Sequence, residues 1–161
     1  MKQPVAPIAI GSDHNGYALK EQLRQYLLAK NLPVVDYGCG SADVVDYPEV
    51  ALTVARAIAA GKHERGILVC GTGIGMAIAA NKVPGVYAAQ CHDPYSADRA
   101  RKSNDAQIIT FGARVVGAEL AKMLIDIWLE AEFAGGDSAR KVSQIRDAET
   151  SLPAAKSGGT R

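Results

Sequence analysis

The sequence predicts an α/β fold in which a parallel five-stranded sheet is covered by helices on both faces. Short apolar runs alternate five times with longer segments of helical spacing along the 161 residues. Regular alternation of this kind is typical of parallel strands joined by crossover helices. The runs are close to continuously apolar, as expected for strands buried on both faces. A chain of this length also fits one domain with a sizeable core.

The first two strand–helix units are expected within the first 61 residues. The apolar run at 5–11 predicts a strand, and apolar residues at helical spacing predict a helix over 16–30. A second strand is expected at 33–38. The helix over 48–61 follows, because a proline stands near its start and a glycine at its end.

The remaining three units follow the same alternation. Their strands are expected at 66–70, 86–91 and 106–112. Their helices are expected at 75–82, 94–102 and 117–133, the last being long and amphipathic. The crossovers between the parallel strands should be right-handed.

The end of the chain differs from the rest. A further helix is expected over 135–149, and the small polar residues of 150–161 predict a flexible tail. No domain boundary or internal repeat is evident, so 1–149 is predicted to form a single domain.

Composition excludes several classes of protein. The formal net charge is +1 and basic residues form no run, which argues against nucleic-acid and membrane-surface binding. No apolar stretch is long enough for a signal peptide or a membrane span. The cysteines Cys39, Cys70 and Cys91 form no CxxC pair, which favours a reducing compartment over a disulfide framework. The cytoplasm is the expected location.

Polar residues follow each predicted strand. Ligands of open parallel sheets bind at the carboxyl ends of the strands, so these residues are candidates for one site. They are Asp13 and His14, then Asp43, Asp46 and Tyr47, then Cys70, then His92 and Asp93, and finally Arg114.

The segment "CGTGIG" is the most informative of these loops. Glycines 71, 73 and 75 let backbone N–H groups converge at the start of a helix, which makes an anion site. A phosphate-binding P-loop would end in Gly-Lys-Ser/Thr, whereas Met-Ala follows here. A dinucleotide fingerprint fits poorly in spacing and position. An oxyanion hole remains, and it alone gives Cys70 a role, because a helix N-terminus favours the thiolate of a cysteine.

Structural explanations compete with each functional one. Cys70 could be a small buried hydrophobe at a strand end, and Asp13 or His14 could cap the following helix. Cys39 and Cys91 fit packing positions. A metal site built from His14, His92 and the cysteines stays open, although no metal-ligand spacing supports it.

Five segments together resemble a known family. They are "GSDHNGYALK", "DYP", "ILVCGTGIGMAIAANKVPG", "PYSA" and "SNDAQIITFGARVVGAELAKMLIDIWL". They are similar to the ribose/galactose-phosphate isomerase family, and within it to the type B ribose-5-phosphate isomerases, over about residues 7 to 147. The resemblance implies a Rossmann-like three-layer α/β/α sandwich that interconverts aldose and ketose phosphates by proton transfer between C1 and C2. It implies no metal or organic cofactor.

The resemblance also implies a role for residues of the glycine loop. Cys70 matches the base that moves the proton, with Thr72 hydrogen-bonding near it. The amides from Gly71 through Gly73 to Gly75 would hold the enediolate. Asp13 and Ser103 are the further catalytic candidates.

Substrate-binding residues are implied in the same way. Asp13 and His14 match a pair that binds the sugar hydroxyls and the phosphate end, and Tyr47 matches a substrate-side tyrosine. Asn104 and Arg114 resemble residues contributed by a second subunit. The implied assembly is a homodimer with shared active sites, or a tetramer. The helix over 117–133 supports a dimer, because its apolar stripe exceeds what one sheet face should cover; the stripe comprises Leu120, Leu124, Ile127, Trp128 and Ala131.

The sequence departs from the family pattern at two places. Many members have a ring-opening histidine where this chain has Ser103. The family's "GGRHxxR" reads "GGDSARK" here, so Asp137 and Lys141 replace two phosphate-binding arginines, and Arg140 is displaced by about 100° if the segment is helical. Lys141 could still bind phosphate as a point charge.

These departures leave the substrate open. Ribose 5-phosphate is the leading expectation, with Ser103 and a water, or His92, opening the ring. A tetrose 4-phosphate is the alternative, because its C4 oxygen is esterified and cannot close a furanose. A non-catalytic sugar-phosphate-binding subunit is the alternative from outside the enzymes.

Overall fold

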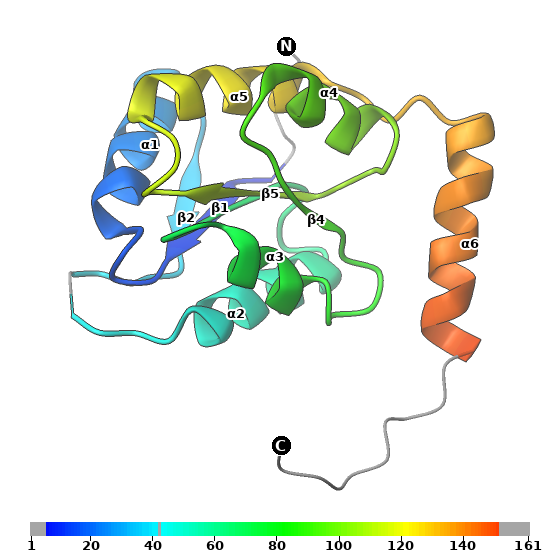
Figure 1. Ribbon diagram of the computed structural model, residues 1–161, viewed down its shortest axis with the longest axis horizontal. Helices are drawn as coiled ribbons and strands as arrows, with labels where there is room; N and C mark the ends of the chain where they lie inside the picture. The colour runs from blue at the N-terminus through cyan, green and yellow to red at the C-terminus, as the bar shows by residue number, and fades with distance from the viewer. Residues whose placement is uncertain (1–5, 42, 152–161) are drawn as a thin grey trace, which may run out of the picture.

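The structure is a computed structural model that describes residues 6–41 and 43–151, and it confirms the α/β fold (Figure 1). All five strands are parallel, in the order β2-β1-β3-β5-β4. The strands are β1 (Ile8–Ser12), β2 (Val34–Asp36), β3 (Gly66–Cys70), β4 (Ala88–Gln90) and β5 (Ile108–Gly112). The helices are α1 (Tyr17–Ala29), α2 (Tyr47–Ala59), α3 (Ile74–Ala80), α4 (Pro94–Lys102), α5 (Ala118–Glu130) and α6 (Asp137–Ser151).

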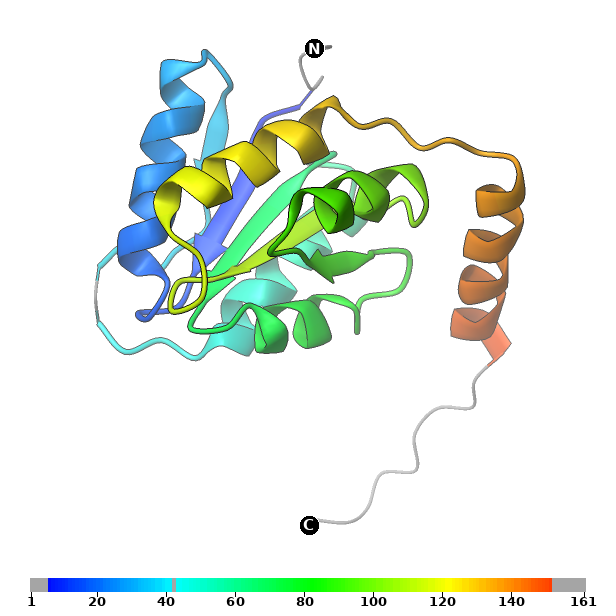
Figure 2. The same ribbon diagram turned by 45° about the horizontal axis from the view of Figure 1, so that its top comes forward.

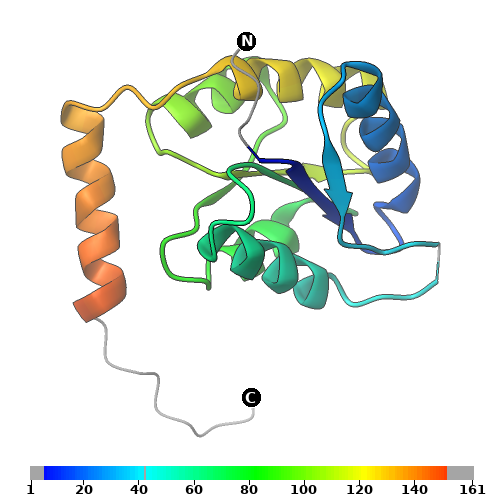
Figure 3. The ribbon, with the colours of Figure 1, turned by 180° about the vertical axis from the view of Figure 1, so that it is seen from behind.

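Two helical layers sandwich the sheet. Helices α1, α4 and α5 cover one face and helices α2 and α3 the other, as Figures 1 and 3 show. The three central strands β1, β3 and β5 are buried at every residue. Trp128 and Phe111 belong to the core under the first layer, and Leu68 and Ile108 to the core under the second. The near-continuous apolar runs are therefore strands buried on both faces of the sheet, as expected.

The prediction that the apolar stripe of α5 is too large for one sheet face to cover is wrong. Leu124 and Trp128 are fully buried, and Leu120 and Ile127 pack against the same core. Trp128 Nε1 also donates to Ala106 O at 3.2 Å, so the indole nitrogen is satisfied within the chain. The sheet face thus covers most of this stripe without a second copy.

Helix α6 stands apart from the sandwich. Figures 1 and 2 show it beside the edge strand β4, joined to α5 by an extended segment and lying at the opposite end from α1. Gly85 N donates to Glu149 Oε2 at 2.9 Å, which ties the helix to the loop before β4. The helix runs to Ser151, past the predicted end at 149. The rest of the predicted tail, 152–161, lies outside the described residues, and the single-domain boundary stays a prediction.

No helix within the described ranges is long and apolar enough to cross a bilayer.

Candidate active site

The site forms where β3 ends and α3 begins. Gly73 precedes α3 with φ +78°, a left-handed conformation that favours glycine. A Cβ on Gly73 would also lie 2.8 Å from the carbonyl carbon of Phe111 on β5. Thr110 Oγ1 donates to Gly73 O at 2.8 Å and fixes this turn from the same strand. The glycine spacing therefore produces a tight, anchored turn directly after Cys70.

This turn holds the Cys70 thiol by a backbone contact. Gly73 N donates to Cys70 Sγ at 3.1 Å, and Cys70 is only 5% exposed. An amide directed at the sulfur stabilises a thiolate. The thiol also lines a pocket, so the two explanations of Cys70, a buried side chain and a reactive one, apply at once.

The amides of the loop divide into two sets. Gly73 N is committed to Cys70, and Ile74 N donates to Thr72 Oγ1 at 3.3 Å. The amides of Gly71, Thr72 and Gly75 have no acceptor within 6–41 and 43–151. The expectation that every amide from Gly71 to Gly75 holds an oxyanion is therefore too broad, since part of the loop is occupied in orienting its own side chains.

A pocket of about 410 Å³ opens in front of the thiol. It is lined by Asp13, Asn15, Tyr47, Cys70, Gly71, Thr72, Ile74, Gly75 and Ile78. Tyr47 enters it because Gly75 has no side chain: a Cβ there would lie 2.5 Å from the Tyr47 ring. Tyr47, predicted from the loop before α2, is thus packed directly on the glycine loop.

Asp13 and His14 lie at the end of the neighbouring strand β1. Asp13 is buried and accepts a hydrogen bond from Gly16 N at 2.9 Å through Oδ1. It therefore caps the turn before α1 while also lining the pocket. His14 Nδ1 lies 3.3 Å from Val45 O, which joins it to the loop before Tyr47.

Arg114 follows β5 and lies at the rim of the same pocket. Arg114 N donates to Gly71 O at 3.1 Å, and Arg114 Nη2 donates to Asn15 Oδ1 at 2.8 Å. The Arg114 side chain thus contacts Asn15, which lines the pocket of its own chain, and its predicted role toward a second subunit stays a prediction. Asn15 was missed because an Asn between His14 and a glycine resembles an ordinary turn residue.

Four of the predicted site residues lie away from the Cys70 pocket, at the amino edge of the sheet or on α6. Ser103 and Asn104 follow α4, which runs back from the carboxyl edge of the sheet to the amino edge, where β5 begins. Lys102 O accepts from Ala134 N at 3.0 Å, which places the approach to α6 at the same edge. Arg140 and Lys141 are exposed on α6. The chain therefore does not bring these four residues to its own Cys70.

Ser103 is engaged by a neighbour on its own helix. Arg99 donates to Ser103 Oγ from Nε at 2.8 Å and from Nη2 at 2.5 Å. Both lone pairs of the hydroxyl oxygen are thus used by one guanidinium. The Ser103 hydroxyl therefore holds the Arg99 guanidinium in place, and its oxygen has no free lone pair with which to act as a base.

The other titratable groups near the carboxyl edge have structural partners. His92 Nε2 accepts from Gly112 N at 3.1 Å, and burial lowers the pKa of this histidine while Asp93 opposes the shift. Burial raises the pKa of the Cys91 thiol to about 12. Cys39 and Cys91 are buried packing residues, as predicted.

The structure offers no support for the metal site considered from the sequence. Across the described part of the chain, no cluster of three or more His, Cys, Asp or Glu could hold a metal ion.

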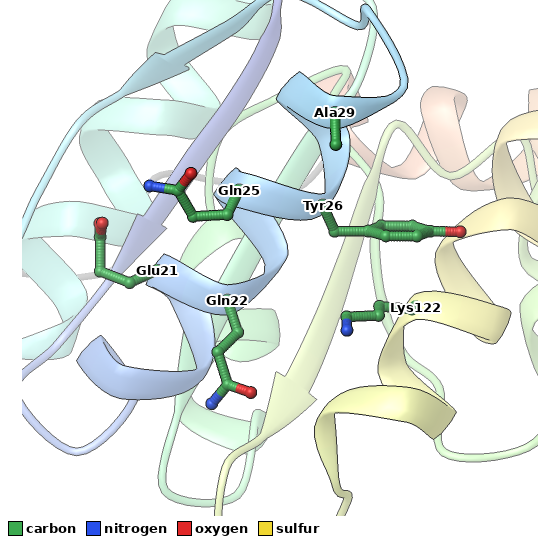
Figure 4. Close-up of a pocket in the computed structure, with 6 residues that line it drawn as sticks. All are labelled: Glu21, Gln22, Gln25, Tyr26, Ala29 and Lys122. Atoms are coloured by element: carbon green, nitrogen blue, oxygen red, sulfur yellow. The ribbon is translucent and has the colours of Figure 1, made fainter.

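A larger groove of about 500 Å³ lies between α1 and α5 (Figure 4). Two of its lining side chains are engaged by neighbours on α5: Tyr26 donates to Asp126 Oδ2 at 2.5 Å, and Lys122 donates to Glu119 Oε1 at 2.6 Å. None of the predicted site residues lines it. We therefore assign the candidate site to the pocket at Cys70.

Comparison with known proteins identifies the class that this fold and pocket define. Residues 8–145 match the family described as Ribose/Galactose Isomerase. The chain therefore belongs to this family and is an aldose–ketose isomerase of sugar phosphates.

Individual relatives are similar over nearly their whole length. A D-erythrulose-4-phosphate isomerase of Pectobacterium atrosepticum is 59% identical over 139 residues, 86% of this chain and 91% of the relative. A ribose-5-P isomerase B of Listeria innocua is 51% identical over 87% of this chain and 95% of its own. The structure of Clostridium thermocellum ribose-5-phosphate isomerase B superposes with a TM-score of 0.88 at 47% identity, covering 89% of this chain and 97% of the other.

Proposed function

We propose that the chain interconverts the aldose and ketose forms of a tetrose 4-phosphate, with Cys70 as the base. The observation that carries this proposal is the state of Ser103, whose hydroxyl oxygen accepts two hydrogen bonds from Arg99. A site for ribose 5-phosphate must open a furanose ring, which needs a group that exchanges a proton with the ring oxygen. A tetrose 4-phosphate forms no such ring and needs no such group.

The alternative ring-opening group is also engaged. His92 Nε2 accepts the amide hydrogen of Gly112, so this nitrogen is not free to take a hydroxyl proton. The relative from Pectobacterium atrosepticum, named an erythrulose 4-phosphate isomerase, adds support at 59% identity.

The chemical step follows from the loop geometry. The Cys70 thiolate takes the proton from C2 of the aldose, and the released electron pair forms the C1–C2 double bond of an enediolate. The unengaged amides of Thr72 and Gly75 donate to its negative oxygen, which is how oxyanion holes act. The thiol then returns the proton to C1, while the O2 proton passes to O1. Asp13 is the carboxylate placed in the same pocket to carry this second proton.

The site is completed by a second copy of the chain. Ile74 and Ile78 of α3 line the pocket, yet they are 51% and 57% exposed. Apolar residues exposed together beside a pocket are typical of an interface. Asn104 lies at the far edge of its own sheet, so it can serve only another subunit's Cys70. A closed dimer would make this exchange reciprocal.

Ribose 5-phosphate remains the second candidate. Ribose-5-phosphate isomerases B at 51% and 46% identity favour it. The test is kcat/KM for D-erythrulose 4-phosphate and ribose 5-phosphate, measured side by side on the wild-type chain. We expect the tetrose value to be at least about tenfold higher, which corresponds to roughly 1.4 kcal/mol of transition-state binding. A tenfold preference for ribose 5-phosphate would overturn the tetrose proposal, and absence of turnover would favour a binding subunit.

A further inference from the structure

Asn15 stands at the centre of a chain of hydrogen bonds around the pocket. Its Oδ1 accepts from Arg114 Nη2 at 2.8 Å, and its Nδ2 lies 3.3 Å from His14 Nε2. Arginine only donates hydrogen bonds, so the Asn15 amide must direct its oxygen to Arg114 and its nitrogen to His14. His14 Nε2 is then the acceptor, which leaves the ring proton on Nδ1; that nitrogen lies 3.3 Å from Val45 O and 3.4 Å from Val45 N, so both backbone groups hold the ring in place. Each side chain thereby fixes the orientation of the next.

The Arg114 guanidinium at the end of this chain is a cation free to bind an anion. It takes part in no ion pair within the described ranges 6–41 and 43–151. Its Cδ and Nε lie 3.8 Å from the place of a Cβ on Gly71, the residue directly after Cys70. Asn15 Cβ lies 4.0 Å from the same point. Asn15 thus holds an unneutralised guanidinium beside the thiol loop, and guanidinium groups suit phosphate.

We propose that Asn15 is a specificity-determining residue that keeps Arg114 close to the Cys70 loop and thereby favours four-carbon sugar phosphates over longer ones. This rests on the proposed function, because the phosphate must be the group that Arg114 binds. The reacting carbons C1 and C2 must sit at Cys70 in any substrate. The phosphate of a tetrose 4-phosphate is then one carbon closer to the thiol than that of a pentose 5-phosphate. A guanidinium anchored beside Gly71 matches the shorter distance.

Loss of Asn15 should release this constraint. Arg114 is exposed, and its Asn15 contact is the side-chain hydrogen bond that draws it toward the pocket. Without that contact, its long side chain can extend outward to the phosphate of a longer sugar. Asn15 itself is exposed, so its substitution should leave the core and the fold intact.

Two variants test the proposal. Asn15→Leu keeps the size of the side chain and removes both hydrogen bonds. Asn15→Asp keeps the oxygen facing Arg114, but its charge neutralises the guanidinium and lies near Asp13 Oδ2, which is 3.5 Å from the present amide nitrogen. For each variant, kcat/KM is measured with erythrulose 4-phosphate and ribose 5-phosphate, together with the inhibition constant of inorganic phosphate.

We expect Asn15→Leu to lower kcat/KM for the tetrose by about tenfold and for ribose 5-phosphate by clearly less, since a mispositioned cation costs the shorter substrate more. Inorganic phosphate should inhibit Asn15→Asp roughly tenfold more weakly, because the charge-assisted contact is lost. Equal losses for both sugars, or unchanged inhibition by phosphate in Asn15→Asp, would overturn the proposal.

The result separates this inference from the proposed function. If the wild type prefers ribose 5-phosphate, the tetrose function fails. The Asn15 inference would still require the ratio of the two kcat/KM values to move further toward ribose in Asn15→Leu. A ratio that stays constant removes the Asn15 inference whichever sugar the wild type prefers.

Discussion

The candidate site residues at the carboxyl edge of the sheet share one pocket, whereas those at the amino edge do not. At the carboxyl edge, Asp13, Tyr47 and Cys70 line one pocket, and each is held by a backbone or glycine contact. At the amino edge, Ser103 is anchored to its own helix and Asn104 is exposed. A single chain therefore assembles the pocket at the carboxyl edge, whereas the residues at the amino edge line no pocket with Cys70 of the same chain. This contrast is the basis of the proposal that each copy builds its own Cys70 pocket and that a second copy supplies Asn104 to it.

The largest effect is expected at the carboxyl edge, from Cys70→Ala. Removing the base should lower kcat by roughly 10²–10⁴, the usual contribution of general acid–base catalysis. The matched control is Cys91→Ala, since the pKa of Cys91 is raised to about 12 by burial and its thiol should not react. Iodoacetamide should inactivate the wild type and the Cys91 variant alike. Near-normal turnover in Cys70→Ala would remove Cys70 from the mechanism.

Two glycines with the same backbone conformation allow a comparison of stability between the site turn and a remote loop. Gly73 and Gly85 both have φ +78°, but a Cβ on Gly73 would meet the Phe111 backbone at 2.8 Å, whereas a Cβ on Gly85 would meet nothing within 4 Å. Gly85→Ala should cost about 1 kcal/mol for the left-handed conformation alone. Gly73→Ala should cost roughly 3 kcal/mol, because the backbone contact adds overpacking. Urea unfolding at one protein concentration measures both, and equal costs would contradict the tight turn.

Complementation tests whether the amino edge serves another subunit. Asn104→Ala should lower activity by about tenfold through loss of substrate hydrogen bonds. When the Asn104→Ala and Cys70→Ala chains are unfolded, mixed and refolded together, heterodimers should form. In each heterodimer one of the two sites combines an intact Cys70 with an intact Asn104 and is fully wild type. The mixture should then recover about a quarter of the wild-type activity, as expected for random pairing in a closed dimer. A mixture no more active than the mean of its components would show that Asn104 acts within its own chain or not at all.

The sequence predicted the carboxyl edge better than the amino edge for a physical reason. Cys70 ends a buried strand, Asp13 follows one, and Tyr47 begins a helix, so the parallel topology alone brings them together. Asn15 and Arg114 meet although 99 positions separate them. That contact depends on rotamers, which no local pattern encodes. The α5 stripe was misjudged because the width of the sheet face it covers is set by packing with α1 and α4 and not by the helix itself. The role of Ser103 also depends on Arg99, a contact visible only once α4 is built.

The smallest effect is expected at His92, which lies at the carboxyl edge without lining the pocket. Burial lowers the pKa of His92 in the folded chain, so below the unfolded value of about 6.5 the unfolded state binds more protons. Stability from this group is therefore present above pH 6.5 and is lost as the pH falls from there toward the folded pKa. His92→Gln keeps an acceptor for Gly112 N and does not titrate, so it should flatten the decline in stability below pH 6.5. Asp93 provides a separate reference, because its depressed pKa makes its contribution decline only below about pH 4. Urea midpoints measured between pH 7 and 5 give the two slopes, and equal slopes in wild type and His92→Gln would show that His92 does not titrate differently on folding.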